Sequence, residues 1–127
     1  MTRAECVILV EPFPAERELI ESVLAAEGIE VLPATSLLEG ILQQAVTQGR
    51  VVLYDADAPE HWRTALEQFL RLQPVTHVIV LSRLADDHMW IEVLDTGGYD
   101  LLMKPLRADE VRGVVHNALR RLSAAAA

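Results

Sequence analysis

The stretch HVIVL at residues 77–81 is the clearest strand in the chain, because it is short, apolar and rich in β-branched residues. On either side of it, residues 61–72 and 86–96 place apolar side chains three and four positions apart, as helices do. Strands that alternate with helices are typical of βα units, whose strands lie parallel in one sheet. The pattern around residues 77–81 therefore predicts a parallel α/β fold.

The same alternation continues in both directions and gives five strands and five helices. Because crossovers between parallel strands are right-handed, we expect one doubly wound five-stranded parallel sheet with helices on both faces. The expected strands are residues 6–10, 29–32, 51–54, 77–81 and 99–103, and the expected helices are residues 14–26, 36–48, 61–72, 86–96 and 108–122.

The apolar spacing also predicts how individual helices face the sheet. In the fourth helix Ile91 and Leu94 are expected to turn inward, which leaves Trp90 partly exposed beside Met89. Pro74 is expected to stop the third helix. The residues expected to face inward in the second helix are Leu37, Leu38, Ile41, Leu42, Ala45 and Val46.

Composition limits the classes of function open to the chain. Its 127 residues are 51% apolar, with a mean hydropathy of +0.22 and a formal net charge of -8, which predicts one globular domain rather than a disordered chain. The acidic balance argues against direct binding of nucleic acid, and no apolar run approaches the roughly 20 residues that span a bilayer. We expect a cytoplasmic domain over residues 1–123, with residues 124–127 as an alanine-rich tail that is either a natural end or the start of a linker.

Polar side chains follow four of the predicted strands, at positions that should meet at one edge of the sheet. In such sheets function collects beyond the carboxyl ends of the strands, so we expect these side chains to converge. Carboxylates crowded in one pocket bind a cation, gain a proton or are balanced by a neighbouring ammonium. The residues at these positions are Glu11, Asp55, Asp57, Ser82 and Lys104.

Three motifs, in this order and spacing, resemble the receiver domain of bacterial two-component response regulators. The resemblance implies the flavodoxin-like receiver fold, with Asp55 as the phosphoacceptor. It also implies that the hydroxyl of Ser82 and the ammonium of Lys104 contact the phosphoryl group, so we expect a non-enzymatic phosphorelay module. The motifs are DADAP at residues 55–59, VIVLS at residues 78–82 and GGYDLLMKP at residues 97–105.

The chain departs from the receiver pattern where the metal is held. Receivers usually carry two adjacent acids after the first strand, whereas this chain has Glu11-Pro12. Pro12 stands where the resemblance places a direct Mg²⁺ ligand, and proline has no carboxylate. Glu11, Asp55 and Asp57 remain as candidate ligands. We expect an atypical receiver, one ligand short, in which Mg²⁺ binding and phosphorylation are weak or absent.

A second departure concerns the surface that contacts partners. Leu101 stands where the family commonly has an aromatic switch residue, and strand alternation would place Tyr99 on the same face. Together with Met89 and Trp90, Leu101 marks a face where receivers meet partners or dimerise, as the resemblance implies. The expected partners are a sensor histidine kinase or another signalling protein, a second copy of the chain, and a fused or separate output domain.

A function from a different class is also open. Asp55 and Asp57 imitate the nucleophile and the acid/base of phosphohydrolases that resemble the haloacid dehalogenase superfamily, with Ser82 and Lys104 as phosphate-binding groups. In that superfamily the metal-binding acid pair follows the lysine, whereas the acid pair at residues 86–87 precedes Lys104 here. The order of these residues favours the receiver.

Overall fold

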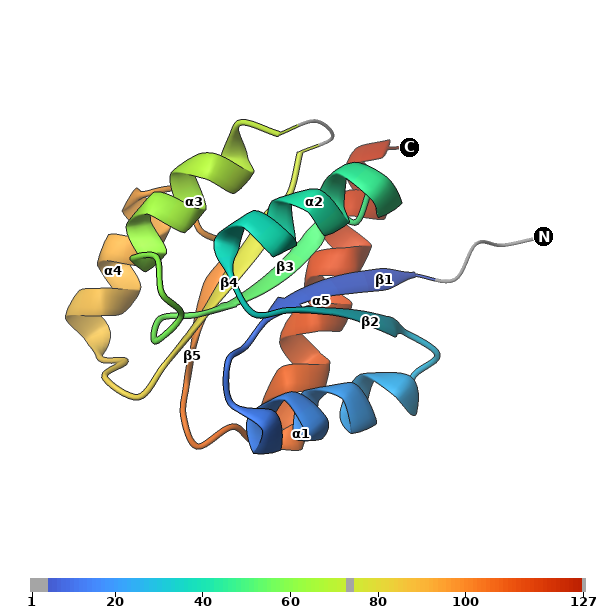
Figure 1. The fold of residues 1–127 in the computed structure, drawn as a ribbon, viewed down its shortest axis with the longest axis horizontal. Coiled ribbons are helices and arrows are strands. Elements are labelled where there is room, and N and C mark those ends of the chain that lie inside the picture. The colour runs from blue at the N-terminus through green and yellow to red at the C-terminus, as the bar shows by residue number, and fades with distance from the viewer. Residues whose placement is uncertain (1–4, 73–74, 127) are drawn as a thin grey trace.

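A computed structural model describes residues 5–72 and 75–126, and it contains the predicted sheet (Figure 1). The elements are β1 (Cys6–Val10), α1 (Pro14–Ala25), β2 (Glu30–Ala34), α2 (Leu37–Thr47), β3 (Val51–Asp55), α3 (Trp62–Leu70), β4 (His77–Ser82), α4 (Asp87–Asp95), β5 (Asp100–Met103) and α5 (Ala108–Ala126). The strands pair in parallel in the order β2-β1-β3-β4-β5. The direction of winding reverses between β1 and β3, so the carboxyl ends of these strands flank the crevice where such sheets bind ligands.

Each central strand sends alternate side chains to two separate helical layers. Val7 and Leu9 of β1 pack in one core with α1 and α5, whereas Ile8 and Val10 pack in a second core with α2, α3 and α4 (Figure 1). Every residue of β3 is buried, which explains its continuous apolar sequence. Because helices cover both faces of the sheet, functional side chains gather at the strand ends.

The second strand lies further along the chain than the predicted residues 29–32. It spans Glu30–Ala34 and includes Pro33, which pairs in register with Leu9 of β1. Proline is tolerated there because β2 is an edge strand with a partner on one side only.

The last helix is longer than predicted, since α5 continues past Leu122 to Ala126. Residues 124–126 are therefore helical where a tail is expected, and Ala127 lies outside the described residues. Pro74, the expected stop of the third helix, also lies outside them, and α3 ends at Leu70. No helix in the described part of the chain is long and apolar enough to span a membrane.

The predicted inward face of α2 is right for Leu37, which is buried, and for Ile41, which packs against the second core, but it is wrong for the other four residues. Leu38, Leu42 and Val46 are 65%, 55% and 82% exposed, and Ala45 is also exposed, whereas Gly40 and Gln44 are buried. The cause is Gly40, where an added Cβ would lie 2.8 Å from Cγ2 of Val10. A glycine allows this close approach of helix to strand, and the helix turns about it so that Leu38, Leu42 and Val46 point outward.

The predicted face of α4 is also wrong. Val93 is buried, whereas Ile91 and Leu94 are both exposed. Val93 packs against Gly98, where an added Cβ would lie 2.5 Å from Cγ1 of Val93. The contact with this glycine orients the helix, and Trp90 stays partly exposed as predicted.

Tyr99 does not share a face with Leu101, contrary to the prediction from strand alternation. Tyr99 packs with the α1 and α5 core, where its hydroxyl accepts a hydrogen bond from Asn117 of α5 at 2.8 Å. Leu101 packs with the opposite core. Alternation fails because β5 begins at Asp100, so Tyr99 belongs to the turn that precedes the strand.

Candidate functional site

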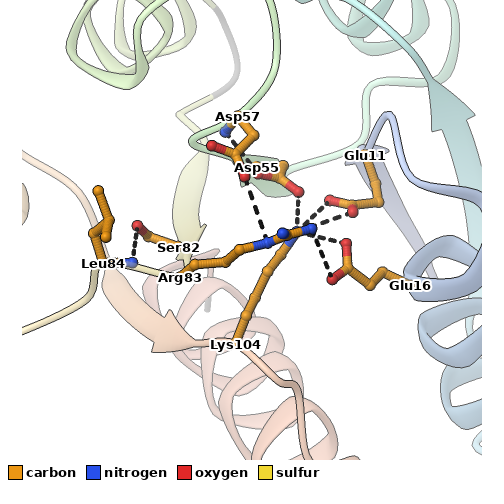
Figure 2. Close-up of polar contacts among 8 residues, drawn as sticks. All are labelled: Glu11, Glu16, Asp55, Asp57, Ser82, Arg83, Leu84 and Lys104. Carbon is orange, nitrogen blue, oxygen red and sulfur yellow. Dashed lines mark hydrogen bonds and ion pairs between the residues drawn. The ribbon is translucent and has the colours of Figure 1, made fainter.

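A buried ammonium surrounded by three carboxylates lies at the carboxyl edge of the sheet (Figure 2). The Nζ atom of Lys104 donates to Asp55 Oδ2, to Glu16 Oε2 at 2.7 Å and to Glu11 Oε1 at 3.1 Å. The side chains of Lys104, Glu11 and Asp55 are 2%, 0% and 0% exposed. An ammonium has three N–H donors, so these contacts use its full capacity.

The strand ends place three members of this cluster, as the sequence predicts. Glu11 follows β1, Asp55 is the last residue of β3 and Lys104 follows β5. The backbone N–H of Glu11 donates to the backbone carbonyl of Ala34 at 3.2 Å, and that of Lys104 donates to the backbone carbonyl of Ser82 at 3.0 Å. The sheet pairing therefore extends into the site. The side chains therefore start from rigid backbone.

The fourth member, Glu16, is missed by the strand-end argument. It lies in the first turn of α1, which begins at Pro14 directly after the β1 end. A carboxylate within the first turn of a helix that follows a strand was the signal available in the sequence. Within the described part of the chain, Glu11, Glu16 and Asp55 form a group whose carboxylate oxygens lie within 4.8 Å of one another, close enough to hold a metal ion.

Asp57 is not part of this group. Its side chain is 50% exposed and pairs with Nε of Arg83 at 3.7 Å. Its backbone N–H donates to Asp55 Oδ1 at 2.7 Å, so Asp57 supports the Asp55 carboxylate through the main chain. The sequence predicts that the Asp57 carboxylate lies in the pocket. In the structure Glu16, and not Asp57, is the third acidic side chain there.

In the described part of the chain, the Ser82 hydroxyl and the side chains of the proposed partner residues make no hydrogen bond to the carboxylate cluster. The Oγ atom of Ser82 is buried at the end of β4 and accepts a hydrogen bond from the N–H of Leu84 at 3.0 Å. Trp90 donates through Nε1 to Asp100 Oδ1 at 3.1 Å, which holds its ring toward β5. Met89 and Leu101 are half-buried against the core beneath α4.

Burial and charge set the protonation of the cluster. Burial, together with the neighbouring Asp55 and Glu16 carboxylates, raises the pKa of Glu11 to about 10. The contact with Glu11 and those with Lys104 lower the pKa of Glu16, although burial acts the other way. Burial opposes the charge on Lys104, but its hydrogen bonds to the carboxylates outweigh this and raise its pKa. At neutral pH Glu11 holds a proton while Glu16 and Lys104 are ionised.

This arrangement makes stability depend on pH through Glu11. Its folded pKa of about 10 lies above the ordinary value of 4.5, so the folded protein holds a proton that the unfolded chain releases. The stability this proton provides is complete below the unfolded pKa and is lost as pH rises toward the folded pKa. The lowered pKa of Glu16 affects stability at the acidic end of the pH range, and the raised pKa of Lys104 affects it at the alkaline end.

We therefore expect Glu11→Gln to flatten the pH dependence of stability. Between about pH 6 and about pH 9 the wild type should lose about 1 kcal/mol or more of unfolding free energy relative to the variant, since glutamine does not titrate. Urea unfolding at both pH values measures this difference. If the unfolding free energy changed equally with pH in the two proteins, Glu11 would not be the titrating group.

Comparison with known proteins identifies the class of protein that carries this site. The response regulator receiver domain model matches residues 7–116, so the chain belongs to that family. It is a receiver domain of two-component signalling. The comparisons give no support to the phosphohydrolase alternative.

Curated relatives include proteins about twice as long as this chain and one of about the same length. KDP operon transcriptional regulatory protein KdpE of Escherichia coli (strain K12) is 31% identical over 121 residues, which cover 95% of this chain and 54% of KdpE. Chemotaxis protein CheY of Bacillus subtilis (strain 168) is 24% identical over 118 residues, which cover 91% of this chain and 98% of CheY. The chain thus spans about half of KdpE and about half of transcriptional regulatory protein AruR of Pseudomonas aeruginosa.

Solved structures share the fold. A response regulator from Thermotoga maritima matches with a TM-score of 0.85 at 21% identity, over 93% of this chain and 99% of that one. The BeF3-activated receiver domain of Klebsiella pneumoniae RstA matches with a TM-score of 0.81 at 21% identity, over 91% and 99%. The predicted receiver fold is confirmed.

Proposed function

We propose that Asp55 is the phosphoacceptor of this receiver domain. The observation that supports this most is its place as the last residue of the central strand β3, fully buried and paired with Lys104. In the transfer, an Asp55 carboxylate oxygen forms a bond to phosphorus while the bond from phosphorus to the donor's leaving group breaks, and the leaving group takes that electron pair. Asp55 thereby becomes an acyl phosphate.

Lys104 and Ser82 are the groups that contact the transferred phosphoryl group in this proposal. The ammonium of Lys104 already lies against Asp55, so it can pair with phosphoryl oxygens as the carboxylate charge is consumed. The Ser82 oxygen accepts a hydrogen bond from Leu84, which leaves its O–H to donate to a phosphoryl oxygen. Both groups neutralise charge and leave the chemistry to the carboxylate.

We further propose that Mg²⁺-dependent phosphorylation is weak. Glu16 and Asp55, together with Glu11 once it has released its proton, can hold Mg²⁺, because carboxylate oxygens suit this ion, and the ion would neutralise charge on the phosphoryl oxygens. Two features oppose its binding. Lys104 contacts all three carboxylates and must be displaced, and Pro12 adds no carboxylate beside Glu11.

Phosphoramidate with Mg²⁺, followed by intact-mass measurement, tests both parts of this proposal. We expect slow and partial addition of one phosphoryl group to the wild type and none to Asp55→Asn. Asp109→Asn is the matched control and should react like the wild type, because its side chain is 67% exposed in the first turn of α5 and pairs with Arg107 rather than with a pocket residue. Modification that persists in Asp55→Asn would exclude this acceptor, and rapid complete modification of the wild type would exclude weak phosphorylation.

We propose that the domain acts in the cytoplasm without enzymatic turnover, through contacts with other proteins. Its partners would be a sensor histidine kinase or another signalling protein, and an output domain, fused or separate. The domain itself does not bind nucleic acid in this proposal, because its net charge of -8 repels polyanions.

We assign contact with partners, including a second copy of the chain, to the partner face, made of Met89, Trp90 and Leu101. Trp90 is 45% exposed, and exposed aromatic residues are enriched in interfaces. We expect Met89→Ala combined with Trp90→Ala to weaken self-association about tenfold or more, as measured by sedimentation equilibrium. The matched control, Leu38→Ala with Leu42→Ala, removes exposed apolar groups from α2 and should leave association unchanged. Equal effects of both pairs would contradict the assignment.

A further inference from the structure

Arg83 reaches across the mouth of the acidic pocket (Figure 2). It follows the last residue of β4, and its Nε lies 3.7 Å from Asp57 Oδ2. Its Nη2 lies 3.8 Å from Glu16 Oε1. Asp57 follows β3 and Glu16 belongs to α1, so the guanidinium spans two walls of the site that holds Asp55.

The guanidinium of Arg83 uses none of its donors in a hydrogen bond to the part of the chain that the structure describes. Its two ion pairs, at 3.7 and 3.8 Å, are longer than hydrogen bonds. Its central carbon lies 4.8 Å from the centre of the Phe13 ring, which fixes the group by cation–π contact. The side chain is 57% exposed. An oriented guanidinium whose five donors remain unused matches the oxygens of a phosphate.

Lys104 provides the contrast. Its side chain is 2% exposed and its three donors are occupied by Glu11, Glu16 and Asp55, so an anion that enters from solvent meets Arg83 first. The two cations are adjacent in the pocket: one oxygen of Glu16 faces each of them, and Phe13 lies within 5.0 Å of both. The pocket therefore has an inner cation that is already paired and an outer cation that is available.

We propose that Arg83 binds the phosphoryl oxygens of a small phosphodonor at the pocket entrance and holds the phosphoryl group once it is on Asp55. This inference rests on the proposed function, in which Asp55 is the acceptor. With phosphoramidate as donor, the bond from Asp55 to phosphorus forms as the P–N bond breaks, and the nitrogen leaves with its electron pair as ammonia. Asp55 exchanges one negative charge for the roughly two of a phosphoryl group. The guanidinium compensates this added negative charge when it leaves the carboxylate oxygens of Asp57 and Glu16 and pairs with the phosphoryl oxygens.

Anion binding is tested without phosphotransfer in the Asp55→Asn background. Inorganic phosphate is titrated into Asp55→Asn while the Nε–Hε signals of arginine are followed by NMR and the heat is followed by calorimetry. We expect saturable binding with a shift of the Arg83 signal, and an affinity about tenfold lower or more when Arg83→Ala is added. Arg63→Ala is the matched control. Arg63 is another exposed arginine, but it belongs to α3 and pairs with Glu92 of α4 rather than with a carboxylate of the pocket. Binding that survives Arg83→Ala overturns the inference.

The second measurement is the rate of Asp55 modification by phosphoramidate. We expect Arg83→Ala to lower the second-order rate constant about tenfold or more, Arg83→Lys to lower it less, and Arg63→Ala to leave it unchanged. A rate for Arg83→Ala equal to or above that of the wild type overturns the inference, because the arginine would then only cover the pocket. Phosphate binding that needs Arg83, in a protein that phosphoramidate never modifies, would contradict the phosphoacceptor proposal and support anion binding by Arg83.

Discussion

Replacement of Lys104 by methionine is expected to lower the free energy of unfolding by about 3–5 kcal/mol, the usual cost of removing one partner from a buried ion pair. Methionine keeps much of the side-chain volume but leaves Glu11, Glu16 and Asp55 without their shared ammonium. Urea unfolding followed by tryptophan fluorescence, with a chelator present to exclude divalent cations, measures the effect.

Two control variants separate this electrostatic effect from packing. Arg63→Met removes an ion pair with Glu92 whose partners are 46% and 36% exposed, so it should cost about 1 kcal/mol or less. Adding Asp55→Asn to Lys104→Met should restore part of the lost stability, because one of the repelling carboxylates is removed. A loss below about 1 kcal/mol for Lys104→Met would contradict the role of the ammonium as the counter-charge of the pocket.

Replacement of Pro12 by aspartate is expected to raise the affinity for Mg²⁺ about tenfold or more, because Mg²⁺ requires a nearly complete set of oxygen ligands at short distance. The new carboxylate would follow Glu11 directly at the end of β1 and would give Mg²⁺ a further ligand, so that the ion competes better with Lys104 for the place beside Asp55. Mg²⁺ titration can be followed by the fluorescence of Trp62, which begins α3 after the Asp55 loop. The yield of phosphorylation should rise in parallel.

Pro12→Ala is the control for this experiment. It removes the proline ring without adding a carboxylate, so it should leave Mg²⁺ affinity close to that of the wild type. If alanine raised the affinity as much as aspartate does, the constraint would be the backbone of Pro12 and not the missing ligand. If neither substitution changed the affinity, the weakness would lie with Lys104.

The sheet and the strand-end residues could be predicted because both follow from short-range pattern. A buried parallel strand such as β3 is apolar throughout, and the residue that follows or ends it must lie at the sheet edge. This reasoning places Glu11, Asp55 and Lys104 together, and the structure does bring them together.

The parts that could not be predicted depend on how helices turn against the sheet. Glu16 joins the pocket because α1 starts directly behind β1, and the rotation of its first turn is set by packing that spacing does not reveal. The faces of α2 and α4 differ from prediction for a related reason. Gly40 and Gly98 permit contacts closer than a side chain would allow, and these contacts outweigh the apolar periodicity of the helices.

The third acidic side chain of the pocket is Glu16, and not Asp57 as the sequence predicts, so the number of acids facing Lys104 stays at three. A carboxylate at residue 57 was expected to share the site, but it faces Arg83 at the surface. Glu16 takes its place, so the pocket holds three carboxylates and one ammonium despite Pro12. The third acid of the cluster comes from a helix, while the position after Glu11 still lacks a carboxylate.

The most direct test of the central claim is to map the modified residue. After long incubation with phosphoramidate and Mg²⁺, borohydride reduction converts an acyl phosphate to an alcohol, so a phosphorylated aspartate becomes homoserine, which peptide mass spectrometry locates. We expect homoserine at position 55 alone, at low yield in the wild type and at higher yield in Pro12→Asp. Reduction at Asp57, Glu11 or Glu16, or no reduced residue in either protein, would contradict the assignment of Asp55 as the phosphoacceptor.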